Sequence, residues 1–128
     1  MEAFEIASAC GLLADEKKAK DAVIMHLAEL TDIADYFLVA SGMSERHVRT
    51  IADSIETGMK QRGVLPYSVE GYSQGRWVII DYGNVVAHVF LDPLRELYDL
   101  ESLWVEAKQY RVQNERKDAE VENGKTKA

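Results

Sequence analysis

The chain has 128 residues, of which 47% are hydrophobic, so it has the material for one domain with a sizeable core. Its formal net charge of −7 argues against general nucleic-acid binding, which needs a basic face, and favours a basic protein or a small ligand as partner. The single cysteine, Cys10, excludes an internal disulfide bond and a cysteine-based metal cluster. The first residues contain no basic leader sequence, and no apolar run approaches the ~20 residues of a membrane span, so we expect a cytoplasmic protein without membrane contact.

The amino-terminal half of the chain predicts two helices and two strands. Apolar residues recur at helical spacing over residues 3–20, which predicts a helix, and residues 21–30 are typical of a buried strand. The segment YFLVAS, residues 36–41, predicts a second strand. The clearest helix follows, because Ser44 is a good N-cap, one apolar stripe runs along the segment, and Gly63 is a good stop.

The second half of the chain predicts a short strand, a hairpin and a helix. Residues 67–71 are typical of a short edge strand. Residues 76–91 contain two apolar runs around Gly83-Asn84, a pair that suits a two-residue hairpin turn. Helical spacing of apolar residues returns over 94–104 and predicts the last helix.

Together these elements predict an α/β (α+β) domain with a mixed, mostly five-stranded sheet flanked by helices. The strand–helix–strand step from 36–41 to 67–71 predicts parallel pairing of these two strands, whereas the hairpin must be antiparallel. We expect the domain to span residues 1–108. Residues 109–128 are charged and poor in core residues, so we expect them to form a disordered tail.

The hairpin has two faces, because side chains alternate along a strand and can be assigned by counting outward from the turn. One face is almost entirely apolar, as expected beneath packed helices. The other, called the mixed face below, consists of Trp77, Ile79, Asp81, Val86, His88 and Phe90. Aromatic anchors beside directional polar groups are typical of the centre of a protein interface. From the hairpin alone, a second interpretation is equally good: this face is the second side of a two-sided core, and His88 is a buried imidazole within it.

The chain offers little to a catalytic site. Its histidines, His26, His47 and His88, show no metal-binding spacing, so we expect no metal and no cofactor. No nucleophile elbow or Walker lysine is present, and Asp81 stands without a second carboxylate on its strand. We therefore predict a protein that is not an enzyme. The alternative is a small nucleotide- or phosphate-binding enzyme that uses the turn from Gly42 to His47, ahead of a helix N-terminus.

Four segments occur in one order along the chain: TDIADYFLVASG, SERHVRTIAD, GRWVIIDYGNVVAHVF and RELYDLESLW. Together they resemble the ribosomal silencing factor (RsfS, Iojap-like) family, over about residues 5–106. The resemblance implies a sheet flanked by helices, similar in shape to nucleotidyltransferases but without their catalytic carboxylates. It also implies a function: members bind the large-subunit ribosomal protein L-fourteen and block association of the two ribosomal subunits, which represses translation under nutrient limitation. Organellar relatives serve in ribosome assembly.

The resemblance further implies which residues contact the partner. Asn84 departs from the family, which usually has Asp there; Asn keeps the turn but removes a negative charge that could meet a basic partner. We expect no sequence-specific nucleic-acid binding, and a homodimer formed through the same face when the protein is free, because a bare aromatic face is adhesive. The expected partner-binding residues are Trp77, Ile79, Asp81, Asn84, His88, Phe90, Arg46, His47 and Glu70.

Overall fold

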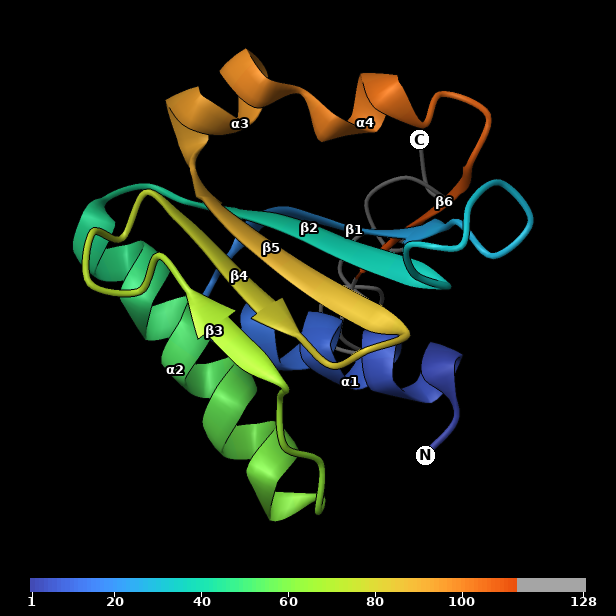
Figure 1. Cartoon of the computed structure of the whole chain (residues 1–128). Coiled ribbons are helices and arrows are strands. Elements are labelled where there is room, and N and C mark those ends of the chain that lie inside the picture. The colour runs from blue at the N-terminus through green and yellow to red at the C-terminus, as the bar shows by residue number, and fades with distance from the viewer. Residues whose placement is uncertain (113–128) are drawn as a thin grey trace, which may run out of the picture.

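The computed structural model describes residues 1–112 and consists of one sheet with helices on both faces (Figure 1). Helices α1 and α2 lie against one face, and α3 and α4 lie against the other (Figure 1). The elements are α1 (Ala3–Glu16), β1 (Lys20–His26), β2 (Tyr36–Gly42), α2 (Glu45–Gln61), β3 (Ser68–Glu70), β4 (Trp77–Asp81), β5 (Val85–Leu91), α3 (Asp92–Tyr98), α4 (Leu100–Leu103) and β6 (Lys108–Arg111). None of the helices within the described residues is long and apolar enough to cross a membrane.

The sheet is mixed, as predicted, with the strand order β3-β4-β5-β2-β1-β6. The predicted parallel pairing of 36–41 with 67–71 is wrong, because β2 pairs in parallel with β5 while β3 pairs antiparallel with β4. The side chains of β5 are buried on both faces, as a central strand requires, whereas β3 is only three residues long and mostly exposed. The predicted edge position of β3 is confirmed.

The sixth strand overturns the first part of the predicted tail. Residues Lys108–Arg111 form β6, which pairs antiparallel with β1 and places Tyr110 opposite Ile24. The next residue, Val112, donates its N–H to the carbonyl of Ala22 at 2.8 Å. Apolar side chains spaced among the charges therefore anchor this segment to the sheet. The rest of the predicted tail, 113–128, lies outside the described residues.

Helix α1 ends earlier than the apolar spacing predicts. The helix stops at Glu16, and Lys18 adopts a left-handed conformation with φ of 61°. The N–H of Ala19 donates to the carbonyl of Ala14, and that of Lys18 donates to Asp15, which is the hydrogen-bond pattern of a Schellman motif. A lysine stands where glycine usually marks such a stop, so the sequence gives no sign of it. The following strand correspondingly starts at Lys20 and ends at His26, before the predicted limit of residue 30.

Helix α2 follows the prediction closely. The Ser44 side chain accepts a hydrogen bond from the backbone N–H of His47 at 3.0 Å, so Ser44 is the N-cap. The apolar stripe of the helix faces the sheet and α1. A Cβ added to Gly58 would clash with the Leu13 side chain, so the glycine permits close contact between the two helices.

The sheet separates two apolar cores. The larger core fills the space between the sheet and helices α1 and α2. The smaller core lies on the other face beneath α3 and α4, where Phe37, Phe90 and Met25 are buried and Leu94, Leu100 and Trp104 pack against them. Burial on both faces makes this a three-layer domain.

The predicted helix over 94–104 is interrupted at Asp99, whose φ is 46°. The N–H of Asp99 donates to the carbonyl of Arg95 at 2.8 Å and ends α3, and α4 begins at the next residue. Buried Arg95 ties this region to the sheet: its guanidinium pairs with Glu101 at 3.1 Å and donates to the Ser41 hydroxyl at 3.0 Å. The break lets residues from both short helices point towards the smaller core.

Candidate protein-interaction surface

The hairpin of β4 and β5 has the predicted register. Trp77 lies opposite Phe90, Ile79 opposite His88, and Asp81 opposite Val86. Gly83 has a φ of 92°, and the N–H of Tyr82 donates to the carbonyl of Val85 at 2.8 Å across the turn. The six side chains of the mixed face therefore do share one side of the sheet, and it is the side that faces α3 and α4.

Part of the mixed face belongs to the smaller core. Phe90 is fully buried and His88 is only 6% exposed, so neither reaches the surface as the sequence-based prediction of partner contact requires. The cover comes from α3, since the ring of Tyr98 lies 4.8 Å from that of Trp77 and 6.3 Å from that of Phe90. At Phe90 and His88, the alternative interpretation of the sequence therefore holds: this face of the sheet is part of a second core.

The buried imidazole of His88 orients Trp77. The indole Nε1–H of Trp77 donates to His88 Nδ1 at 3.1 Å, which leaves the proton of a neutral ring on Nε2. Nε2 is buried and has no hydrogen-bond partner among the described residues. Burial lowers the pKa of His88 to about 4, and the negative charge of Asp81 acts in the opposite direction. His88 is therefore neutral at physiological pH and fixes the indole ring by a hydrogen bond.

Three members of the mixed face remain partly exposed: Trp77, Ile79 and Asp81. Glu70 lies opposite Ile79 on the neighbouring strand β3, so the structure brings this predicted residue to the same face. The carboxylate of Asp81 is partly committed to the turn, because its Oδ1 accepts the N–H of Gly83 at 2.7 Å. Asn84 is exposed at the tip of this turn.

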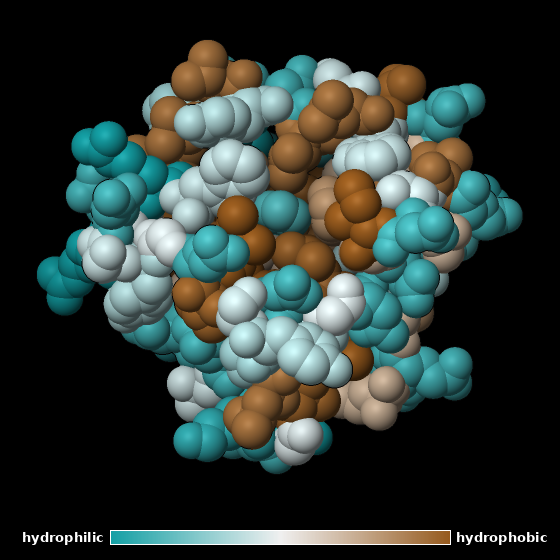
Figure 2. Space-filling view, viewed as in Figure 1, coloured by the Kyte–Doolittle hydropathy of each residue, from teal (hydrophilic) through white to brown (hydrophobic). Residues whose placement is uncertain are grey.

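Sequence reasoning missed the outer side of α3 and α4. Leu97, Tyr98, Leu103 and Val105 are all exposed, with Leu97 at 73%. Figure 2 shows hydrophobic side chains gathered over α3 and α4. Because Tyr98 contacts Trp77, the exposed side of α3 adjoins the exposed part of the mixed face. The apolar surface, as it is called below, consists of Trp77, Ile79, Leu97, Tyr98, Leu103 and Val105.

The helical spacing over 94–104 does contain Leu97, Tyr98 and Leu103, but spacing alone assigns them to a core. Leu94, Leu97, Tyr98 and Leu103 follow one another as a single helical stripe would. The break at Asp99 divides that stripe between two short helices. Within α3, Leu94 packs inward while Leu97 faces outward, and Leu103 of α4 is exposed as well. Nothing in the sequence marks Asp99 as the breaking position.

Arg46 and His47 are not brought to the mixed face. Both belong to the first turn of α2, which packs on the opposite side of the sheet (Figure 1). His47 has a structural role: its Nδ1 accepts the N–H of Met43 at 2.9 Å, and its Nε2 lies 2.8 Å from the carbonyl of Lys17. It thereby joins the end of α1 to the start of α2. Arg46 is exposed beside it.

The turn from Gly42 to His47 is poorly suited to phosphate. The backbone N–H groups of Met43 and His47 already donate to the side chains of His47 and Ser44. The first turn of α2 also carries the carboxylate of Glu45, which opposes an anion. No group of three His, Cys, Asp or Glu side chains close enough to hold a metal ion occurs within residues 1–112.

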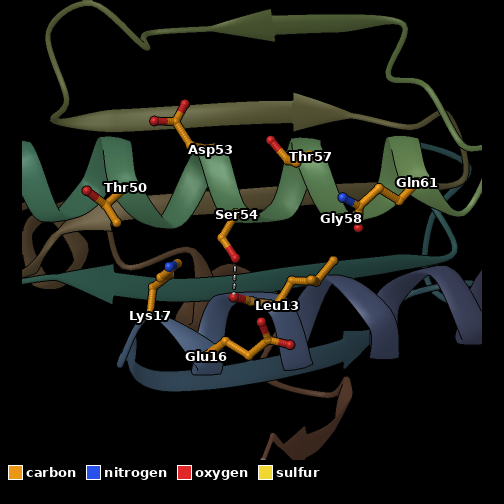
Figure 3. A pocket seen from close by; sticks show the side chains of 9 residues that line it. All are labelled: Leu13, Glu16, Lys17, Thr50, Asp53, Ser54, Thr57, Gly58 and Gln61. Carbon is orange, nitrogen blue, oxygen red and sulfur yellow. Dashed lines mark hydrogen bonds between the residues drawn. The ribbon is translucent and has the colours of Figure 1, made fainter.

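A shallow groove between α1 and α2 is an alternative place for a ligand (Figure 3). Its volume is about 380 Å³, and its charged lining residues are Glu16, Asp53 and Lys17, so two carboxylates and one ammonium give a net negative charge that opposes a phosphate. The hydroxyl of Ser54 donates to the carbonyl of Leu13 at 2.8 Å, as the dashed line in Figure 3 shows. These polar groups thus hold the helices together, and the groove contains no buried polar atom in need of a ligand.

The chain is thus a small mixed α/β domain with an exposed apolar surface around Trp77. The chain belongs to the ribosomal silencing factor family, since the family model described as "Ribosomal silencing factor during starvation" matches residues 1–128. A ribosomal silencing factor of Halalkalibacterium halodurans is 42% identical over 93 residues, which cover 73% of this chain and 80% of that protein. This family carries a regulatory name, in agreement with the resemblance found in the sequence.

Two further relatives extend the comparison. A crystal structure of a Chromobacterium violaceum protein is similar with a TM-score of 0.80 and 34% identity, covering 89% of this chain and 90% of that chain, which confirms the fold class. The mouse protein named "Mitochondrial assembly of ribosomal large subunit protein 1" is 31% identical over 104 residues, or 79% of this chain and 45% of that protein.

Proposed function

We propose that this protein binds ribosomal protein L-fourteen on the large ribosomal subunit and blocks association of the small subunit, so that translation is repressed under nutrient limitation. Membership of the ribosomal silencing factor family supports the ribosome as target, and the name of the mouse relative refers to the large subunit. The observation in the structure that carries the proposal is the apolar surface around Trp77. The protein acts in the cytoplasm by occlusion and not as an enzyme.

Trp77 is the proposed anchor of this contact. Its indole is held by the hydrogen bond to His88 and stacks against Phe90 and Tyr98, with ring centroids 4.8 Å away in both cases. A pre-organised ring loses little conformational entropy on binding. Trp77→Ala should therefore weaken binding by about 2 kcal/mol or more. Buried His88 and Phe90 act from beneath by fixing the anchor.

Polar residues form the rim of the proposed contact around Trp77. Carboxylates at Asp81 and Glu70 lie on the same face as Trp77, and we propose that they meet basic groups of the partner. The net charge of −7 accelerates association with a basic ribosomal protein. Asn84 is exposed and completes the proposed contact at its edge. Arg46 and His47 lie across the sheet on α2, so we do not include them in this contact, although the sequence had suggested both.

Co-sedimentation with isolated ribosomal subunits tests the target, and light scattering during subunit association tests the blocking step. The protein should pellet with the large subunit alone and should prevent association in proportion to its occupancy. Selective pelleting without any effect on association would refute occlusion, and pelleting with neither subunit at micromolar protein would refute the target.

A matched pair of leucine substitutions tests the surface itself. Leu97→Ser removes an exposed leucine, 73% accessible, from the apolar surface, and Leu65→Ser removes one that is 67% accessible from the loop before β3. Only Leu97→Ser should reduce pelleting, since the change in polarity is the same in both variants. Equal behaviour of the two variants would place the contact elsewhere.

We also propose that two free copies pair through the apolar surface, because an exposed patch of this kind promotes association. Analytical ultracentrifugation of the free protein should reveal a dimer that Leu97→Ser weakens and Leu65→Ser preserves. A monomer at high concentration would contradict this pairing without affecting the ribosome proposal.

A further inference from the structure

A second group of accessible aromatic rings lies on the other face of the sheet. Phe4 of α1, His26 of β1, Tyr36 of β2 and Tyr110 of β6 come from four separate elements and are called the aromatic platform below. Tyr110 is opposite Ile24, a residue of the larger core, so the platform faces the α1 side and is separated by the sheet from the apolar surface. The function proposed above makes no use of it.

The rings form one connected set. Phe4 contacts Tyr36 with ring centroids 5.5 Å apart and Tyr110 with centroids 5.8 Å apart, edge-on in both cases. His26 stacks on Tyr36 at 4.9 Å with an interplanar angle of 16°. Phe4 is 45% exposed and Tyr110 is 43% exposed, so their π faces are accessible and not absorbed into the core.

The charges beside the platform are mainly negative. Glu2 is the N-cap of α1 and Glu5 lies in its first turn, on either side of Phe4 in the sequence, and Asp35 directly precedes Tyr36. Glu5 accepts the backbone N–H of Glu2, which keeps its carboxylate at this end of the helix. A basic residue, Lys108, lies opposite His26 at the rim. Three carboxylates near exposed π faces disfavour phosphate and favour a cation.

We propose that the aromatic platform binds an arginine side chain presented by a segment of a basic protein. A guanidinium is planar, so it can stack on Phe4 or Tyr110 while its N–H groups pair with a neighbouring carboxylate. A lysine ammonium lacks this planar stacking and is more strongly hydrated. RNA would also offer planar groups, but its phosphates would meet the carboxylates around the platform. The platform thus gives the protein a second contact, independent of the apolar surface.

Fluorescence anisotropy with short labelled peptides tests this proposal. One peptide alternates arginine with glycine, and the other replaces each arginine with lysine. The arginine peptide should bind more tightly. Phe4→Leu and Tyr110→Leu, which keep apolar volume but remove a π face, should each weaken the arginine peptide about threefold, and together about tenfold. The lysine peptide should change little.

Leu97→Ser on the opposite face is the control and should leave arginine-peptide binding unchanged. If the double variant loses its fold by circular dichroism, Tyr110→Leu alone decides, because Tyr110 lies on the edge strand β6. Equal affinity for both peptides, or unchanged affinity in the leucine variants, would overturn the proposal. Binding of a labelled single-stranded RNA that Tyr110→Leu abolishes would overturn it in favour of base stacking. None of these results depends on ribosome binding through the apolar surface.

Discussion

Acidification tests the environment of His88, a buried residue of β5 whose Nδ1 accepts a hydrogen bond from Trp77. Adding a proton to Nδ1 would remove that acceptor and place a positive charge in the smaller core. The unfolded chain has no such obstacle, so it binds this proton more readily than the folded protein does. The free energy of unfolding should therefore fall as the pH decreases through the interval between the two pKa values.

The size of the effect follows from those values. The pKa of His88 is lowered from 6.5 to about 4, mainly by burial, and each pH unit of difference corresponds to about 1.36 kcal/mol. The His88 contribution should thus be fully favourable above about pH 6.5, decline as the pH falls towards 4, and be lower by about 3 kcal/mol below that.

Urea unfolding of the natural protein and His88→Gln between pH 7 and pH 4 measures this contribution by difference, because other titrating groups cancel. The stability advantage of the natural protein over His88→Gln should shrink by about 3 kcal/mol across the interval. Proton NMR of the His88 ring gives the folded pKa directly. A stability difference that stays constant with pH, or a ring that titrates near 6.5, would refute the buried neutral imidazole.

Three substitutions test the packing that positions the surface. Gly58→Ala should lower the free energy of unfolding by about 2 kcal/mol, because a Cβ would clash with Leu13; unchanged stability in urea would contradict the close contact of α1 with α2. Arg95→Ala should lower the free energy of unfolding by about 3 kcal/mol, because it leaves the partly buried Glu101 unpaired. A double-mutant cycle with Glu101→Ala should show coupling between the two residues, whereas additive losses would argue against the ion pair. Ser44→Ala should lower the free energy of unfolding by about 1 kcal/mol, because it removes the N-cap of α2. Thermal unfolding should show that Ser44→Asp keeps most of this stability, and equal stability of the Ala and Asp variants would count against capping.

Local features of the sequence determined much of the fold. Helix α2 could be predicted because its N-cap and apolar stripe lie within one short segment. The hairpin register could be predicted because Gly83 at positive φ fixes the turn and alternation then assigns every pair. The end of α1 could not be predicted, because Lys18 occupies the left-handed position where glycine usually stands.

The order of the strands depended on contacts between distant residues. The sequence suggests pairing of strands that adjoin one helix, yet β2 lies beside β5. Burial decides this arrangement: β5 is apolar on both sides and needs a central position, while the short and polar β3 tolerates the edge. The addition of β6 likewise rests on Tyr110 and Val112 finding the sheet and α1, which charge-rich composition conceals.

The sequence by itself determined that Trp77, Asp81 and His88 share one face of a hairpin, because alternation is a property of the strand. Only the tertiary structure decided which of them meet solvent: His88 is buried against Phe37 and Phe90, whereas Trp77 stays partly open, and α3 adds its own outer residues, such as Leu97, to the surface. The physical reason is that side-chain direction is set by the backbone of neighbouring residues, whereas exposure is set by whichever distant element gains most by burying its apolar side.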